Sequence, residues 1–278
     1  MSMILPTIDI LICTIAERIN TVSAKLLPPT DWIHYTVSYQ TDGKNIAPPK
    51  ELLERQDVNV ITLEGRGLSR NRNNAIKHAT GQLLVISDDD ATYNLEQLRQ
   101  IQLVASKNPQ ADVLTFMVAT DDGGLLHAYP PETFLYPNRP KGFYYTSDEM
   151  VLRNDKDYPP FDVRFGLGSD RLHMGEEEVF IHDCHKQNLR IEFHPFVIQT
   201  VPRVTTSTHY VSDSSLQESK GAVLTLLHGV PMALARIAYT AFRMRREISP
   251  LKHLTNMLKG MNYILTTKYH DGTASQTI

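Results

Sequence analysis

Residues 67 to 90 read GLSRNRNNAIKHATGQLLVISDDD, and this stretch decides the fold. Its first part predicts a short helix, because Ser69 can cap the N-terminus and Gly81 can end the helix. Its second part, residues 83 to 87, has the length and aliphatic content of a buried strand. A helix followed by a buried strand is the repeating unit of an α/β sheet, and three carboxylates stand directly after this strand.

The carboxylates are Asp88, Asp89 and Asp90, which repel one another unless a cation lies among them. In an extended chain the first and the third point the same way, since side chains alternate with period two. That pair can share one Mn²⁺ or Mg²⁺ ion with the oxygens of a phosphate ligand. The alternative is a solvated acidic turn that caps the next helix, and the triplet alone leaves both interpretations open.

The helix before the strand carries the densest basic stretch in the first half of the chain. Apolar residues repeat at i, i+4 and i+7 along one face of this helix, and Arg72 lies on the same face. A buried arginine requires a partner. Arginines beside a helix N-terminus suit a phosphate, although they can equally pair with surface carboxylates.

The stretch resembles the core signature of family 2 glycosyltransferases, which have the GT-A fold. In that family a Gly-Leu-Ser-x-x-Arg-Asn-like helix precedes a strand that ends in a D-x-D motif. A second block follows about ninety residues later, where residues 161 to 168 read FDVRFGLG and residues 175 to 178 read GEEE. The family usually shows Phe-Asp-x-x-Phe-Gly and then Gly-Glu-Asp at the start of a helix. The resemblance covers about residues 7 to 205 and implies an enzyme of the bacterial surface-polysaccharide type.

The resemblance also implies residue roles. The general base falls on Glu177, and Glu176 is the reserve because Glu replaces the family's Asp. Acidic residues at a helix start also have a purely structural explanation, since the macrodipole favours them. The metal ligands are Asp88, Asp90 and His209. The nucleotide of the donor is assigned to Thr14, Glu17, Gln40, Asp42, Arg66, Ser69, Arg72, Asp88 and Asp89. Tyr144 and Tyr145 are acceptor candidates for a different reason, since they lie in a long excursion and could stack on sugar rings, and Gly168 of the second block is the third acceptor candidate.

Some of these positions depart from the family pattern. The second strand normally ends in an acidic residue that helps to hold the base of the nucleotide. Here the segment reads YQTD, so either Asp42 is displaced or Gln40 takes that role. Many relatives place a histidine after the late strand, and His209 is the nearest one downstream.

Composition sets consistent bounds. A chain of 278 residues with 41% hydrophobic content can bury a proper core. The formal charge of −3 gives no nucleic-acid signature, and two cysteines make a disulfide framework improbable. We find no signal peptide and no apolar stretch near the ~20 residues of a membrane span, so we expect a cytoplasmic protein.

Strand and helix patterns alternate along the chain, which is typical of an α/β sheet. Residues 121 to 160 are rich in Gly, Pro and Tyr and predict a long excursion. Strands are predicted at residues 8–14, 35–39, 58–63, 83–87, 113–119 and 190–200. Helices are predicted at residues 17–24, 48–55, 95–106 and 176–187, besides the arginine-rich helix.

The last sixty or so residues differ in character. After a polar linker at residues 212 to 219, two helices are predicted at residues 223–244 and 250–265. Four arginines lie along or just after the first helix, at positions 236, 243, 245 and 246. Basic amphipathic helices suit peripheral contact with the inner face of a cell membrane, or a partner protein. Packing against the catalytic domain or a homodimer interface is an equal alternative.

The sequence thus predicts a GT-A-type mixed, mostly parallel sheet with flanking helices over residues 1–211, and a C-terminal helical appendage over residues 212–278. The predicted activity is metal-dependent, inverting transfer of a sugar from a nucleotide-diphosphate donor, a UDP-sugar, to a hydroxyl acceptor. The acceptor would be a saccharide or lipid-linked saccharide in surface-polysaccharide or glycolipid synthesis. A metal-dependent nucleotidyltransferase and a non-catalytic nucleotide-sugar-binding module are the alternatives.

Overall fold

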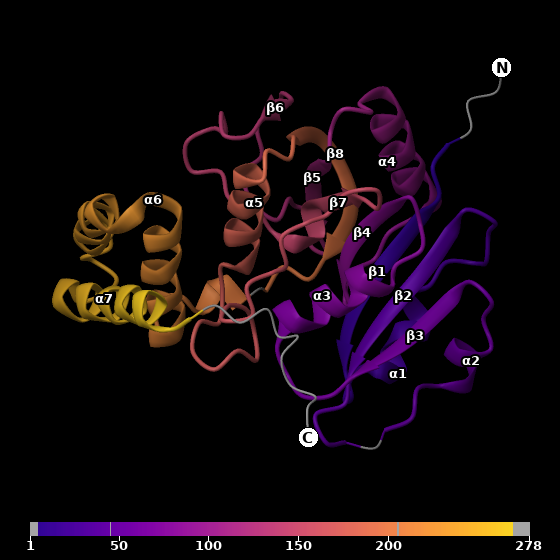
Figure 1. The fold of residues 1–278 in the computed structure, drawn as a ribbon, viewed down its shortest axis with the longest axis horizontal. Helices are drawn as coiled ribbons and strands as arrows, with labels where there is room; N and C mark the ends of the chain where they lie inside the picture. The colour runs from indigo at the N-terminus through magenta and orange to yellow at the C-terminus, as the bar shows by residue number, and fades with distance from the viewer. Residues whose placement is uncertain (1–4, 45, 205, 269–278) are drawn as a thin grey trace. The chain divides into compact units, whose positions relative to one another are not determined.

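The computed structural model describes residues 5–44, 46–204 and 206–268 (Figure 1). The chain divides into two compact units. Unit 1 comprises Met1–Arg66, Asn71–Pro159 and Asp183–Arg203, and unit 2 comprises Gly67–Arg70, Pro160–His182 and Val204–Ile278. The predicted boundary between residues 211 and 212 separates a catalytic domain from an appendage, and it stays a prediction.

Unit 1 contains an eight-stranded sheet with the order β3-β2-β1-β4-β7-β5-β8-β6. Strands β1 to β4 run parallel to one another, β5 pairs with β8 in parallel, and β6 and β7 pair antiparallel with their neighbours. The predicted mixed, mostly parallel sheet is confirmed. The strands are β1 (Ile8–Ile15), β2 (Ile33–Gln40), β3 (Val58–Leu63), β4 (Leu83–Asp88), β5 (Val113–Thr120), β6 (Phe134–Leu135), β7 (Met150–Arg153) and β8 (Ile191–Val201).

The central strands are buried on both faces, as near-continuous aliphatic runs require in a parallel sheet. In β1 every residue before Ile15 is buried. Helix α4 (Leu95–Lys107) packs Leu98 and Ile101 into the same core, and a capping box between Asn94 and Gln97 fixes where it begins. The other short helices of unit 1 are α1 (Ile19–Val22), the 3₁₀ turn η1 (Ser23–Lys25) and α2 (Lys50–Leu53).

Strand β7 was not predicted, although it lies between β4 and β5. Val151 pairs with Val85 on one side and with Leu114 on the other. The predicted excursion over residues 121–160 therefore contributes a central strand, and β6 as well. Four residues are too few to show a period-two pattern, so no sequence signal predicted this strand. The 3₁₀ turn η2 (Ser147–Glu149) leads directly into β7.

Unit 2 is mainly helical. Helix α6 (Ser214–Arg243) and helix α7 (Pro250–Thr266) lie side by side in Figure 1, and the 3₁₀ turn η3 (Thr206–His209) precedes them. A Cβ atom on Gly221 would lie 1.9 Å from the carbonyl oxygen of Met257, and one on Gly260 would lie 1.8 Å from that of Glu218. Only glycine lets the two helix backbones approach this closely.

Two expectations about α6 are wrong. The polar residues predicted as a linker mostly form its first turns, because Asp213 caps the helix by accepting a hydrogen bond from the Ser215 amide at 2.7 Å. The sequence was also expected to lack any stretch suited to a membrane span. By length and hydropathy α6 could span a membrane, although 39% of its apolar 18-residue stretch is buried inside the protein.

Candidate active site

The parallel strands β1, β2 and β4 end at the same edge of the sheet. Ile15 pairs with Gln40, and Cys13 pairs with Asp88, so the last residues of the three strands are neighbours. Ligands of open α/β sheets bind outside the carboxyl ends of the strands. Several residues predicted to bind the donor therefore meet at one edge, which we call the donor edge: Thr14, Glu17, Gln40, Asp42, Arg66 and Asp88 to Asp90.

The aspartate triplet turns rather than continuing as a strand. Strand β4 ends at Asp88, and the amide of Ala91 donates to the Asp88 carbonyl at 3.1 Å. The period-two argument therefore does not apply to the residues beyond Asp88. The side chains of Asp88 and Asp90 are 35% and 40% exposed, whereas the side chain of Asp89 is 7% exposed.

Asp89 anchors this turn to the end of β1. The Thr14 hydroxyl donates to Asp89 at 2.7 Å, and Nη2 of Arg18 lies 2.6 Å from the other carboxylate oxygen. Burial raises the pKa of Asp89 to about 6, and the Thr14 hydrogen bond and the Arg18 charge oppose that rise. Nη2 of Arg18 also lies 3.1 Å from Asp90. Asp89 thus anchors the turn through its contacts with Thr14 and Arg18, while the side chains of Asp88 and Asp90 keep contact with solvent.

Arg72 supports the triplet from helix α3 (Leu68–His78). Its side chain is 2% exposed, as the inward-facing stripe predicted. Nη2 donates to the Ser147 hydroxyl at 2.6 Å and to Oδ1 of Asp88 at 3.2 Å. The buried guanidinium therefore has a carboxylate partner at the donor edge.

Asp148 supports the same carboxylate through the backbone. Its Oδ1 accepts a hydrogen bond from the Asp88 amide at 3.0 Å. The Gln199 side chain on β8 ties this turn to β4, because Nε2 donates to the carbonyls of both Asp148 and Ile86. Burial, with the charge of Asp88 adding to it, raises the pKa of Asp148 well above its usual range. Asp88 is thus fixed by its side chain and by its amide.

The outer residues of the donor edge form ion pairs with one another. Glu17 accepts from Lys44, and Asp42 accepts from Arg66. Asp42 has a φ of 47°, a left-handed turn conformation that Asp tolerates, and it lies just beyond β2. Gln40, at the end of β2, is 3% exposed.

The residues of the donor edge can hold a divalent ion only together with a ligand that supplies further oxygen atoms. No group of three or more Asp, Glu, His or Cys side chains that could hold a metal occurs within the part of the chain that the structure describes. Mg²⁺ is often bound by one or two carboxylates together with substrate phosphates. The partly exposed carboxylates of Asp88 and Asp90 suit that arrangement. His209 is exposed on η3 in unit 2, and its role as a ligand stays a prediction.

The candidate base stands in unit 2, where α5 (Glu176–Lys186) begins. Gly175, with a φ of 97°, is required there, because a Cβ atom would lie 2.4 Å from Cγ2 of Val223. Glu176 is 4% exposed and lies under Gly166, whose Cβ position would be 3.2 Å from the Glu176 carboxyl carbon. Glu177 is partly exposed. Glu177 is therefore the more exposed of the two carboxylates, and its role as the general base stays a prediction.

The loop of unit 2 that contains Gly166 also contacts the first turn of α3. The Ser69 hydroxyl donates to the Phe165 carbonyl at 2.7 Å, and the Leu68 amide donates to the Leu167 carbonyl at 2.8 Å. Ser69 is buried, and its hydrogen bond to Phe165 is a structural contact. Gly168 is exposed in this loop with a φ of 78°.

The predicted acceptor tyrosines differ in exposure. Tyr144 is 41% exposed, and its ring centroid lies 4.2 Å from that of His127. Tyr145 is 3% exposed and packs edge-on against Phe143. Nε2 of His127 lies 2.7 Å from Oε1 of Glu149, which is fully buried. Tyr144 is therefore the accessible member of a packed aromatic group.

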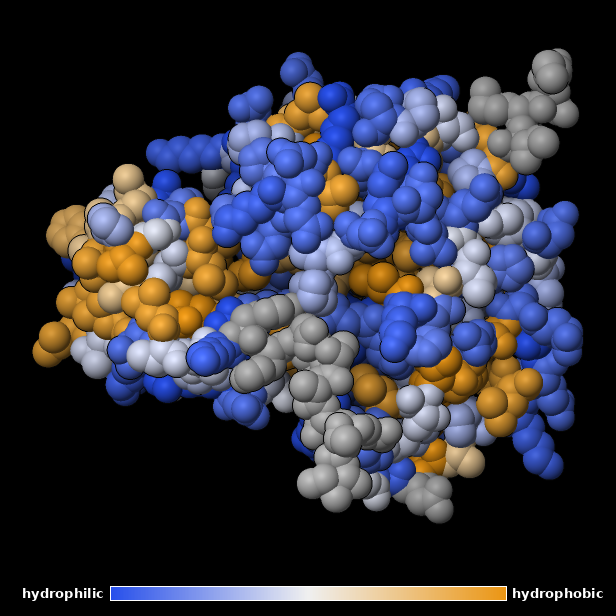
Figure 2. All heavy atoms as spheres, viewed as in Figure 1, coloured by the Kyte–Doolittle hydropathy of each residue, from blue (hydrophilic) through white to orange (hydrophobic). Residues whose placement is uncertain are grey.

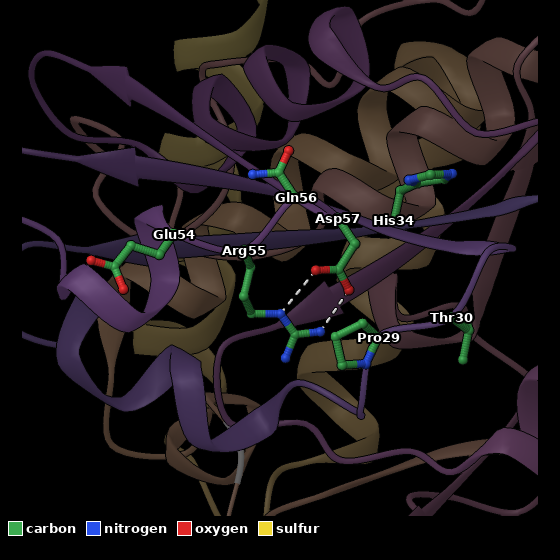
Figure 3. A pocket seen from close by; sticks show the side chains of 7 residues that line it. All are labelled: Pro29, Thr30, His34, Glu54, Arg55, Gln56 and Asp57. Atoms are coloured by element: carbon green, nitrogen blue, oxygen red, sulfur yellow. Dashed lines mark hydrogen bonds and ion pairs between the residues drawn. The ribbon is translucent and has the colours of Figure 1, made fainter.

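A pocket of about 520 Å³ lies at the opposite edge of the sheet (Figure 3). It is lined by Pro29, Thr30, His34, Glu54, Arg55, Gln56 and Asp57. These residues lie where β2 and β3 begin, away from the carboxyl ends of the strands. The Arg55 guanidinium donates to both oxygens of Asp57, at 2.9 and 2.6 Å, and lowers the pKa of that carboxyl. This pair is a structural one, and none of the residues predicted to bind the donor lines the pocket.

Comparison with protein families decides the identity. The family model for glycosyl transferase family 2 matches residues 12–160, which is more than half of the chain. The chain belongs to glycosyl transferase family 2. The protein is a glycosyltransferase, and the matched segment of this glycosyltransferase contains the donor edge, Arg72, the triplet and Asp148.

Solved structures share the fold of this glycosyltransferase. Residues 1–349 of S. aureus TarS match with a TM-score of 0.54 at 14% sequence identity, covering 95% of this chain and 93% of that one. The same fragment crystallised with UDP-GlcNAc matches with a TM-score of 0.53 at 13% identity, covering 92% and 91%. A longer TarS chain matches with a TM-score of 0.52 at 17% identity, covering 86% of this chain and 43% of that one. No curated protein sequence matches the glycosyltransferase.

Three residues that support the aspartate triplet of the glycosyltransferase were missed by sequence reasoning. Arg18 follows β1 and contacts Asp89 and Asp90 after β4. A basic residue after one strand and an acidic triplet after the neighbouring strand would have been a usable signal. Ser147 and Asp148 come from the segment predicted as an excursion, and no sequence pattern ties them to β4. Their contacts with Arg72 and Asp88 can be recognised only in the folded structure, where β7 brings that segment into the sheet.

Proposed function

We propose that this glycosyltransferase moves a sugar from a UDP-sugar to a hydroxyl acceptor with inversion at the anomeric carbon. The observation that carries the proposal is the fixed aspartate turn at the donor edge. Asp88 and Asp90 have partly exposed carboxylates there. Arg72 contacts the carboxylate of Asp88, Arg18 contacts that of Asp90, and Asp148 accepts a hydrogen bond from the Asp88 amide. The TarS fragment that was crystallised with UDP-GlcNAc has the same fold, which supports a UDP-sugar as the donor.

A divalent cation, Mn²⁺ or Mg²⁺, fits this proposal. Asp88 and Asp90 would hold it together with oxygens of the donor diphosphate. When bound, such an ion stabilises negative charge on a leaving diphosphate. Nη2 of Arg72 donates a hydrogen bond to Asp88, so Arg72 orients that carboxylate. The charge of the diphosphate would therefore not be neutralised by Arg72 alone.

Glu177 is proposed as the general base. Inverting transfer needs one group that takes the proton of the acceptor hydroxyl as its oxygen attacks the anomeric carbon. The C1–O bond to the diphosphate breaks as the new C1–O bond forms, and the proton passes to the carboxylate. Glu177 is partly exposed at the start of α5, whereas Glu176 is packed under Gly166, and this difference favours Glu177.

The acceptor is proposed to be a saccharide or a lipid-linked saccharide of surface-polysaccharide or glycolipid synthesis, acted on in the cytoplasm. Tyr144 would stack against a sugar ring, because it is the exposed member of its aromatic group. Tyr145 and Gly168 stay predicted acceptor residues, the first buried and the second exposed in unit 2.

Calorimetry with UDP and with UDP-GlcNAc, each with and without MnCl₂, tests the proposal. Binding should strengthen at least tenfold with MnCl₂ in the wild type, and Asp90→Asn should remove that gain. Asp155→Asn is the matched control, since Asp155 is an exposed residue of unit 1 with a lysine partner. Metal-dependent UDP affinity that survives in Asp90→Asn would show that the ion is not held at the triplet.

The reaction product distinguishes the proposed glycosyl transfer from two alternative functions. A nucleotidyltransferase would use metal to activate attack on phosphorus and would transfer labelled UMP to the acceptor. A non-catalytic module would bind UDP-sugar tightly and release no UDP with any acceptor. Release of UDP coupled to transfer of the labelled sugar supports the proposal against both.

A further inference from the structure

Helix α6 consists of two helical segments joined at a break. Gly229 has a φ of 71° and a ψ of 164°, which are not helical values, and Pro231 follows two residues later. Proline is favoured in the first turn of a helix and disfavoured in its interior. A second helical segment therefore begins at Val230 and ends at Arg243, and we call residues 230–243 distal α6.

One face of distal α6 is already used inside unit 2. Ala233, Ile237 and Ala241 are buried and form one apolar cluster with Met257 of α7. Their i, i+4 and i+8 spacing makes a single narrow stripe along the helix. The other side chains of distal α6 lie outside this cluster.

Those other side chains are largely apolar. Tyr239 and Phe242 are each 62% exposed, and Leu251 at the start of α7 is 74% exposed. Further large exposed hydrophobic residues of distal α6 are Val230, Met232 and Leu234. Figure 2 shows hydrophobic residues gathered over α6 and α7, at the left of the view. Large exposed apolar patches on soluble proteins mark interaction surfaces.

The charge around this surface is predominantly positive. Residues 219–246 contain no Asp or Glu, and Glu247 is the only acidic residue from 219 to 268. Arg236, Arg243, Arg245 and Arg246 are exposed, and none of them takes part in an ion pair within residues 5–44, 46–204 and 206–268. Arg245 lies over the Phe242 ring, 4.2 Å from its centroid. Guanidinium groups beside exposed aromatic and aliphatic side chains complement a surface that is anionic outside and apolar beneath.

We propose that distal α6 and the start of α7 bind an anionic lipid bilayer, with distal α6 lying in the plane of the interface. Apolar side chains such as Phe242 would enter the boundary between headgroups and acyl chains, and the arginines would contact lipid phosphates. The helix does not cross the bilayer in this arrangement. Fourteen residues span only about 21 Å at 1.5 Å per residue, whereas the hydrocarbon core is ~30 Å thick.

The test is sedimentation of the full-length protein with vesicles, and it needs no sugar donor, so its outcome is independent of the proposed chemistry. Vesicles of phosphatidylcholine with 30% phosphatidylglycerol should bind the protein, and pure phosphatidylcholine should bind it at least tenfold more weakly. Raising the salt from 0.05 to 0.5 M should reduce binding, since surface charge is screened. The triple variant Arg243→Gln, Arg245→Gln, Arg246→Gln should reduce partitioning on the order of 100-fold, at about fivefold for each charge.

Matched controls come from unit 1. Lys50, Lys107 and Lys141 are exposed, and their triple change to Gln should leave vesicle binding unchanged. Phe242→Ser should weaken binding, whereas Leu53→Ser, at an exposed leucine of unit 1, should not. A Phe242→Trp variant should show a blue-shifted emission with anionic vesicles, measured against the wild type, whose single tryptophan, Trp32, lies in unit 1.

Three results would overturn the inference. The first is a wild type that does not bind anionic vesicles at low salt. The second is equal loss of binding in the lysine control, which would indicate diffuse electrostatic attraction. The third is a concentration-dependent dimer, seen by sedimentation velocity without vesicles, that Phe242→Ser dissociates. That result would assign the same surface to a second copy of the chain.

Discussion

The guanidinium of Arg72 lies 3.2 Å from the carboxylate of Asp88, although Arg72 is 2% exposed and Asp88 stands at the edge where substrate is expected. A buried arginine without a partner would be costly, so the ion pair explains how it is tolerated in α3. The same guanidinium donates to Ser147. Arg72 therefore links helix α3, the aspartate turn and the segment that precedes β7.

Replacing Arg72 should lower both stability and donor affinity. Arg72→Met removes one partner of a buried pair, and the free energy of unfolding should fall by about 3–5 kcal/mol. The lower part of that range is expected, because Asp88 is one-third exposed and can be hydrated. Arg72→Lys keeps the charge and should cost less. Urea unfolding gives the stability and calorimetry with UDP gives the affinity, and an Arg72→Met variant of unchanged stability would contradict the structural role.

Asp148 should tolerate an amide but not an alanine. Asp148→Asn keeps a carbonyl oxygen that can accept the Asp88 amide at the observed 3.0 Å. Asp148→Ala leaves that amide without its acceptor, which costs about 1–3 kcal/mol for a buried group. The two variants should therefore separate in urea unfolding and in metal-dependent UDP binding. Equal losses in both would mean that the negative charge, rather than the hydrogen bond, is required.

The sequence predicted the parts of the structure that rest on local patterns. The strand from Leu83, the buried side of Arg72 and the start of α5 all follow from periodicity and end signals within a dozen residues. The contacts of Ser147 and Asp148 could not be predicted in this way, because they depend on the antiparallel insertion of β7 between β4 and β5. Pairing between distant segments is set by the whole sheet, and four residues carry no register signal of their own.

His253 should make unit 2 sensitive to acid. It is fully buried on α7, its Nε2 lies 2.8 Å from the Tyr210 hydroxyl, and burial lowers the pKa of its imidazole. The fold therefore prefers the neutral ring. Below the ordinary pKa of about 6.5 the unfolded chain binds more protons than the folded one, so stability is complete above that pH and falls as the pH drops.

The measurement is urea unfolding of the full chain at pH 7.5 and pH 5.5. His253→Gln should show a smaller loss of stability between the two values than the wild type does, because the variant has no imidazole to protonate at that position. His78 is exposed, and His78→Gln should behave like the wild type. An unchanged pH dependence in His253→Gln would rule out His253 as the source.

Glu177 should be required for turnover and nearly dispensable for folding. It is partly exposed at the start of α5, so Glu177→Gln keeps its size and hydrogen bonding and removes only its basicity. A general base contributes about 10²–10⁴-fold, and kcat should fall by that factor while UDP-sugar affinity is preserved. Glu178→Gln, at the next partly exposed position, is the control and should keep most of the activity. Glu176→Gln should instead lower stability, since Glu176 is packed under Gly166. If Glu176→Gln abolishes turnover without a loss of stability and Glu177→Gln stays active, the base is Glu176 and the first turn of α5 must open to expose it.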